Sequence, residues 1–189
     1  MKPDIQRELI SRDATVHLIG ALNAMKDKLL DASRQWELLD ESGHVPAAPS
    51  YTALLQHGAD AQDLSRDVLR LTADFARSPH STTRAGSAVL ARLATASAMS
   101  SHAAPHFAET AESALSLPRS SNPTDLHYLK NRMVIAHASA RAFLRRTSNS
   151  LRDAVKELGD HLDFHRFLST LTPQEGPALP PPRPSGRHR

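Results

Sequence analysis

The spacing of the apolar residues constrains this chain more than any other feature. From residue 18 onward apolar side chains recur at alternating steps of four and three positions, namely Leu18, Leu22, Met25, Leu29, Ala32, Trp36 and Leu39. This spacing places them on one face of an α-helix, which has 3.6 residues per turn. No stretch of strand length alternates apolar and polar residues, so the sequence predicts an all-α fold.

Prolines, glycines and capping residues divide the first half of the chain into helices and loops. We expect a first helix over 4–41 and a loop over 42–50, because Gly43 and two prolines follow the helical pattern. Ser50 is expected to cap a short helix that Gly58 stops. An amphipathic helix should follow and close at Ser78-Pro79.

Prolines, glycines and capping residues divide the second half of the chain in the same way. Ser81 or Thr82 should open a helix that contains Pro105, and an interior proline predicts a kink or two helices that meet there. Thr124 is expected to cap a long helix that ends at Gly159, with a short helix over 160–171 after it.

Four long helical segments joined by short loops predict a mainly antiparallel four-helix bundle with one or two short accessory helices. We expect this bundle domain to cover residues 1–172. Residues 173–189 contain six prolines and two glycines, and their only apolar side chains besides proline are Ala178 and Leu179. A segment of this composition buries too little apolar surface to fold, so we expect a disordered tail rich in Pro and Arg.

Composition and motifs argue against an enzyme. The chain has no cysteine, which removes thiol nucleophiles and thiolate metal ligands. Its seven glycines are scattered singly, so no phosphate-binding loop is present, and no serine lies in a nucleophile motif. The sequence therefore predicts a non-enzymatic protein without a cofactor.

Targeting signals are not evident either. The N-terminal residues alternate charged and apolar side chains, unlike the unbroken apolar region of a secretory signal. The longest stretch without formal charge, 93–108, is too polar to span a bilayer. We therefore expect a cytoplasmic protein without a membrane partner.

The net charge of +3 hides an asymmetry along the chain. Residues 1–75 carry 8 Lys/Arg and 12 Asp/Glu, whereas residues 76–189 carry 15 Lys/Arg and 8 Asp/Glu. No acidic residue occurs over 126–152. This region carries six Lys/Arg residues, and four of them share one helical face with a histidine and with a lysine one turn farther on. These residues form a basic stripe: Lys130, His137, Arg141, Arg145, Arg152 and Lys156.

Three interpretations of the basic stripe are open. It can be a solvated face whose charges pair with acidic residues of the first half, such as Asp31, Glu37 and Asp40. It can bind an acidic protein partner, or it can contact the phosphates of nucleic acid. The residues expected to make partner or phosphate contacts are Lys130, Arg141, Arg145, Arg152 and Lys156.

Two histidine pairs have the spacing of metal ligands. His102 and His106, and likewise His161 and His165, lie four positions apart and therefore on one face of a helix. The acidic residues that a zinc protease or a di-iron bundle needs beside such histidines are missing. Metal binding by these four histidines is thus an alternative and not our main expectation.

The sequence favours a protein that acts by association, with the basic helix as its contact surface. The partner is expected to be another protein or a second copy of the chain, and the apolar seam of the first helix is a candidate for homodimer formation. Nucleic-acid association and metal binding are the alternatives. No resemblance to a known family is evident in these motifs.

Overall fold

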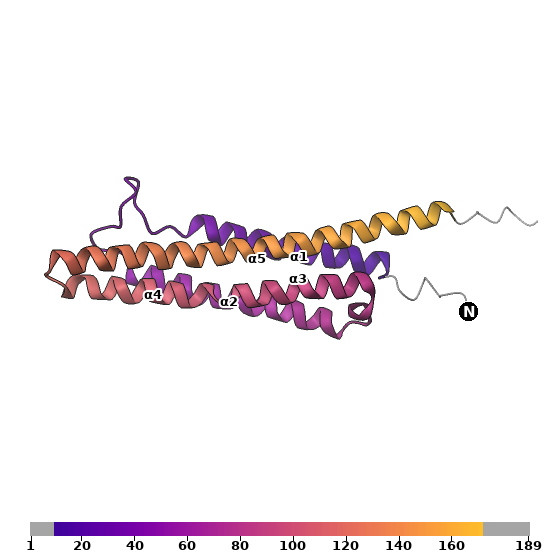
Figure 1. Cartoon of the computed structure of the whole chain (residues 1–189), viewed down its shortest axis with the longest axis horizontal. Coiled ribbons are helices and arrows are strands. Elements are labelled where there is room, and N and C mark those ends of the chain that lie inside the picture. The colour runs from indigo at the N-terminus through magenta and orange to yellow at the C-terminus, as the bar shows by residue number, and fades with distance from the viewer. Residues whose placement is uncertain (1–9, 172–189) are drawn as a thin grey trace, which may run out of the picture.

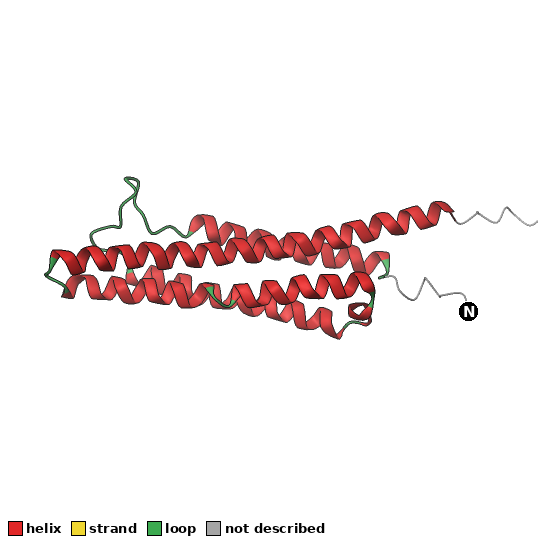
Figure 2. Cartoon of the chain, in the orientation of Figure 1, coloured by secondary structure: helices red, strands yellow, loops and turns green. Residues whose placement is uncertain are grey.

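The computed structural model describes residues 10–171 and consists of helices joined by short loops (Figures 1 and 2). The predicted all-α, mainly antiparallel four-helix bundle is confirmed. α3 and α4 follow each other as two parts of one bent rod, so five α-helices make four rods. The elements are α1 (Arg12–Gln35), α2 (Tyr51–Arg77), η2 (Pro79–Thr82), α3 (Arg84–Ser100), α4 (Ala103–Ser116), η3 (Leu117–Arg119) and α5 (Pro123–Leu171).

The 49-residue helix α5 organises the bundle. It packs along α1 on one side and along α3 and α4 on the other, and α2 packs on α3 and α4 (Figure 1). By contrast, α1 and α2 pack little against each other. The bundle therefore has three closed seams and one open seam, between α1 and α2.

The first helix is shorter at its C-terminal end than expected. It ends at Gln35 and not at 41, because the backbone of Trp36 leaves the helix at φ −81° and ψ 96°. Beyond it, Leu38 and Val45 are buried in a second apolar cluster against Leu54 and Met133. Burial of these side chains at the end of the bundle favours a loop over another helical turn.

The loop that follows α1 is held by a local hydrogen-bond network. The carboxylate of Asp40 accepts hydrogen bonds from the backbone N–H groups of Ser42 and His44, at 2.9 and 3.0 Å, and from the Ser42 hydroxyl at 2.6 Å. The Ser42 hydroxyl and these amides hold the pKa of Asp40 below its usual value. Gly43 completes the turn at φ 77°, a conformation that favours glycine.

Two glycines expected to end helices do not do so. Gly58 lies inside α2 and faces Phe107 of α4, and Gly159 lies inside α5, which continues to Leu171. A glycine inside a helix costs roughly 1 kcal/mol relative to alanine. Tertiary packing of the flanking apolar residues outweighs this cost, so the predicted separate helices over 51–57 and 160–171 are wrong.

Other helix ends agree with the expectations more closely. Ser50 caps α2 through a hydrogen bond from the Ala53 N–H, and α2 ends before Ser78-Pro79. The predicted break near Pro105 is confirmed as the junction between α3 and α4. Ser81 and Thr82 lie in η2 instead of opening α3.

The N-caps of α3 and α5 are not the residues expected from the sequence, which are Ser81 or Thr82 and Thr124. The Thr83 hydroxyl accepts a hydrogen bond from the Gly86 N–H at the start of α3. Asn122, and not Thr124, caps α5, because its side-chain oxygen accepts the Thr124 N–H at 3.0 Å. Each cap satisfies one of the amide groups left unpaired at a helix N-terminus.

Small hydroxyl side chains join the rods inside the bundle. The Ser148 hydroxyl donates to the backbone carbonyl of Lys26 in α1, and the Ser150 hydroxyl donates to the carbonyl of Arg92 in α3. Thr72 of α2 shares a hydrogen bond of 2.8 Å with Ser97 of α3. These bonds and many buried alanines let the helix backbones lie close together in a core with few aromatic residues.

Among residues 10–171, no helix combines the length and apolar character needed to cross a bilayer. The predicted tail over 173–189 and residues 4–9 of the predicted helix over 4–41 lie outside the described residues. That helix does not run unbroken from residue 4, because α1 begins at Arg12, where the Ser11 hydroxyl accepts the Ala14 N–H as the N-cap.

Candidate interaction surface on α5

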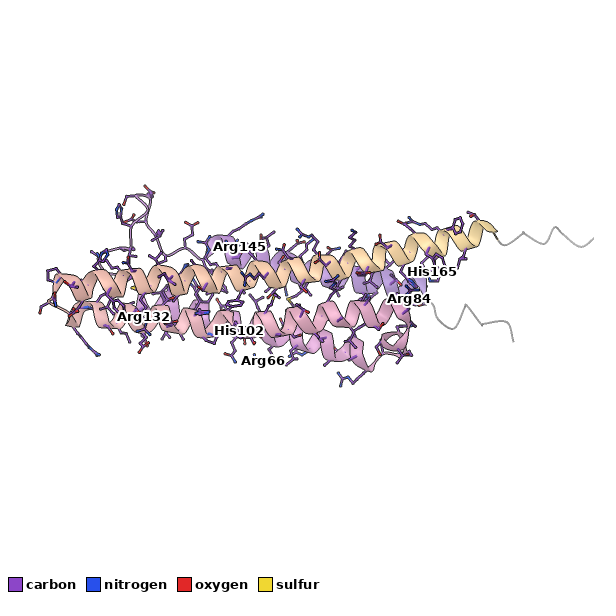
Figure 3. The ribbon with its side chains drawn as sticks, in the orientation of Figure 1. Arg66, Arg84, His102, Arg132, Arg145 and His165 are labelled. Carbon is purple, nitrogen blue, oxygen red and sulfur yellow. The ribbon has the colours of Figure 1, made fainter. Side chains whose placement is uncertain are left out.

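Four cations of the basic stripe lie on the outer face of α5, and we call this set the cationic face. Its members are exposed, and none of the ion pairs within residues 10–171 includes any of them. Arg145 projects from α5 on the side away from α3 and α4 (Figure 3). The cationic face consists of Lys130, Arg145, Arg152 and Lys156.

The other two members of the predicted stripe point toward the bundle. The Arg141 Nε donates to the carbonyl oxygen of Ser33 at 2.6 Å, and its Nη2 lies 3.9 Å from a carboxylate oxygen of Glu37. Arg141 thus neutralises the C-terminal end of α1, where unpaired carbonyls carry partial negative charge. His137 is buried, with 3% of its surface exposed.

Neighbouring arginines of α5 and α3 already have partners. Arg132 contacts both Glu109 and Glu112 of α4 at 3.0 Å, and its hydrogen bond lowers the pKa of the Glu109 carboxyl. Arg92 of α3 lies 3.8 Å from Glu157 of α5. These pairs connect α5 to α3 and α4. The cationic face has no such pair within residues 10–171.

The outer surface of α5 is not purely basic. Ile135 and Tyr128 expose 67% and 65% of their surface beside Arg132. Both side chains line a groove of about 350 Å³ between α4 and α5. Asp153 and Asp160 are exposed farther along the helix. A surface that mixes apolar, basic and acidic side chains is typical of protein contacts.

The two histidine pairs lie in different surroundings. His102 and His106 both pack against the ring of Phe143, at centroid distances of 5.0 and 5.6 Å. The Nε2 of His161 accepts the backbone N–H of Ile10 at 3.1 Å, and the Nε2 of His165 lies 2.9 Å from the Ile10 carbonyl oxygen. Within the described residues, no group of three or more His, Cys, Asp or Glu side chains is placed to hold a metal ion.

A cluster of four rings, of which Phe107 and His137 are buried and Trp36 and His57 half-buried, was not predicted from the sequence. Trp36 stacks on His57 at 5.0 Å, and Phe107 contacts both rings edge-on. His137 completes the cluster 5.4 Å from Phe107 and 6.5 Å from His57. His57 Nδ1 and His137 Nε2 are buried without a hydrogen-bond partner among the described residues.

Burial lowers the pKa of both histidines of this cluster. Loss of hydration lowers the pKa of His137 to about 4, and the charge of Arg141 adds to the effect. Burial also lowers the pKa of His57, against the opposing effect of Asp60. A cavity of about 230 Å³ adjoins His137 and Arg141 and is bounded by the chain at Leu38.

Comparison of the chain with protein-family models, with curated proteins and with solved structures found no match. The class that the structure defines is an antiparallel four-helix bundle with one helix much longer than the others.

Proposed function

We propose that this protein is a non-enzymatic helical bundle that acts by association with a protein partner through the outer face of α5. The observation that supports the proposal is the division of the basic side chains on this helix. Arg132 and Arg141 pair with other helices of the bundle, whereas Lys130, Arg145, Arg152 and Lys156 are exposed and belong to no ion pair within residues 10–171.

The composition of this face favours an acidic protein over nucleic acid. Asp153 and Asp160 lie among the basic residues and would repel phosphates. Beside this face, exposed Ile135 and Tyr128 in the groove between α4 and α5 offer apolar contact area, which protein interfaces use. No aromatic run for base stacking accompanies the basic residues.

Affinity capture from native lysate, with and without nuclease, tests this function. We expect wild-type protein to retain specific proteins after nuclease treatment. A variant with Arg145→Glu, Arg152→Glu and Lys156→Glu should lose at least 90% of them. The matched control carries Arg77→Glu, Arg84→Glu and Arg119→Glu, which change the net charge equally at exposed sites elsewhere.

Two results would contradict the proposal. Equal capture by the α5 variant and the wild type would show that another surface is used. Capture that nuclease abolishes, together with wild-type binding to a duplex or single strand that falls steeply with salt, would instead establish nucleic-acid association.

A further inference from the structure

The open seam between α1 and α2 forms a groove on a different side of the bundle from the cationic face. The groove has a volume of about 400 Å³, and its apolar lining includes Ala32, Trp36 and Leu64. Because α1 and α2 pack little against each other, Trp36 and Leu64 remain partly exposed at this seam, whereas Ala32 is buried beneath them. A partly exposed apolar strip along a helix seam is a surface onto which another helix can pack.

Carboxylates dominate the charge of this groove. Asp31 of α1 faces three aspartates of α2, and Lys28 is the one basic residue among the described lining residues. We call this surface, with Asp31, Asp60, Asp63 and Asp67, the acidic groove.

Only part of this negative charge is neutralised inside the molecule. Asp63 and Asp67 pair with Arg66 and Arg70 one turn away, but these pairs are exposed and therefore worth little. No described ion pair includes Asp31 or Asp60. The groove keeps a net negative charge over an apolar floor.

We propose that the acidic groove receives the cationic face of α5 from a second copy of this chain. This inference rests on the proposed function and names its partner. The charges complement each other, because the cationic face has no counter-ion among the described residues and the groove has excess carboxylates. Asp153 lies between Arg152 and Lys156, and in the docked pair it would face Lys28 in the groove of the other copy.

The three cations at the C-terminal end of the cationic face overlap the length of the groove. Arg145, Arg152 and Lys156 span eleven residues, or about 16 Å of helix at 1.5 Å per residue. Asp60 and Asp67 are separated by seven residues, or about 10 Å on the same basis, and Asp31 widens the groove on the α1 side. One α5 segment can therefore place its basic side chains against both walls of the groove.

The contact joins two different surfaces, so a pair of copies still has one cationic face free on one copy and one acidic groove free on the other. Such head-to-tail contacts produce rings if the rotation closes and open chains if it does not. We expect assemblies that grow with protein concentration instead of stopping at a symmetric dimer. Salt should weaken them, because both surfaces are exposed to solvent.

Charge reversal with mixing tests this pairing by sedimentation velocity of the full chain at low salt. The face variant carries Arg145→Glu, Arg152→Glu and Lys156→Glu, and the groove variant carries Asp31→Lys, Asp60→Lys and Asp63→Lys. Wild type should reach at least twice the monomer mass of 20.6 kDa, whereas each variant alone should remain monomeric. An equimolar mixture of the two should recover the association, because each variant then meets the opposite charge.

Circular dichroism and thermal melting establish that both variants fold, and the Arg77, Arg84 and Arg119 control should associate like the wild type. Monomeric wild type at every concentration would overturn the inference while leaving association with a different acidic protein intact. Association of either variant alone, or no recovery on mixing two folded variants, would equally overturn it.

Discussion

At the scale of single residues, one glycine is required by its surroundings and another is not. A Cβ atom added at Gly86 would lie 1.8 Å from the carbonyl oxygen of His80, which belongs to the rigid turn η2. A Cβ atom at Gly159 in α5 would have nothing within 4 Å. The same substitution should therefore have opposite effects at the two positions.

We expect Gly86→Ala to lower the free energy of unfolding by at least about 2 kcal/mol, because the backbone of η2 must move. Gly159→Ala should raise it by about 0.5–1 kcal/mol, since alanine restricts the unfolded chain and suits a helix. Urea denaturation followed by circular dichroism measures both. A destabilised Gly159→Ala would contradict the continuous helix around this residue.

His137 makes the stability of the protein depend on pH. Its pKa is about 4 in the folded protein, against 6.5 for the ordinary side chain. Between these values the unfolded chain binds a proton that the folded protein excludes, so stability is complete above pH 6.5 and falls as the pH drops toward 4. The loss is on the order of 3 kcal/mol.

We expect His137→Gln to reduce the slope of unfolding free energy against pH between 4 and 6.5. His57 and His161, whose pKa values burial also lowers, should retain part of the slope. Replacing exposed His127 by Gln is the control and should leave the wild-type profile. An unchanged profile in the His137 variant would show that this side chain takes up protons without cost.

The sequence could not reveal the ring cluster around His137. The helical pattern placed this residue on the basic stripe, yet it lies four positions from Met133 and three from Ala140, both of them core residues. His137 therefore lies at the border between the core face and the solvent-facing side of α5. Whether it is buried depends on where α1 ends. Trp36 leaves the helix there and brings its ring onto His57, a long-range contact that periodicity does not encode.

At the scale of elements, the sequence predicted which segments are helical better than where each helix ends. Proline at 79 and the break near Pro105 have local steric causes, so both were predictable. Gly58 and Gly159 carry only a propensity cost, and packing overrides it. The end of α1 depends on the burial of Leu38 and Val45 against other helices, which is a tertiary effect.

The last turns of α5 extend beyond the rest of the bundle (Figure 1). His161 and His165 contact the backbone of Ile10 just before α1 begins, and in the same turns Phe164 and Phe167 expose 47% and 58% of their surface. This part of the helix has fewer buried neighbours than the middle of α5. Segments of this kind open locally at low free-energy cost.

Amide hydrogen exchange should therefore differ along α5. We expect residues 162–168 to exchange at least tenfold faster than residues 144–158, whose side chains include buried Leu144, Leu151 and Leu158. Mass spectrometry of overlapping peptic fragments gives both rates in one sample. Equal protection in the two regions would mean that the end of α5 is covered in solution.

At the scale of the whole molecule, the charges are distributed over separate surfaces. The acidic first half of the chain supplies α1 and α2 with their open seam, and the basic second half supplies α5. The sequence showed this asymmetry but not the groove, because the gap between α1 and α2 depends on how all four rods pack. The sequence also could not tell which basic residues of α5 face solvent. Arg141 binds the Ser33 carbonyl at the end of α1 and is therefore separated from the exposed cations.

The salt dependence of the molecular mass follows from this distribution. Raising the ionic strength from about 0.01 to 1 M shortens the electrostatic screening length from about 30 to 3 Å. We expect the weight-average mass to fall toward 20.6 kDa over this range. Light scattering after size exclusion measures it, and a mass that rises with salt would point to apolar contacts, such as those of Ile135 and Tyr128, as the main attraction.

Trp36 is the one tryptophan of the chain, and it lies both in the ring cluster and on the floor of the groove. The protein therefore carries an intrinsic optical reporter at the place where a second copy would dock. Exclusion of water by the incoming helix should shift its emission to shorter wavelength, and a protonated His57 stacked on the indole should quench it. Assembly and protonation can thus be followed separately, in unlabelled protein, from the colour and the intensity of a single fluorophore.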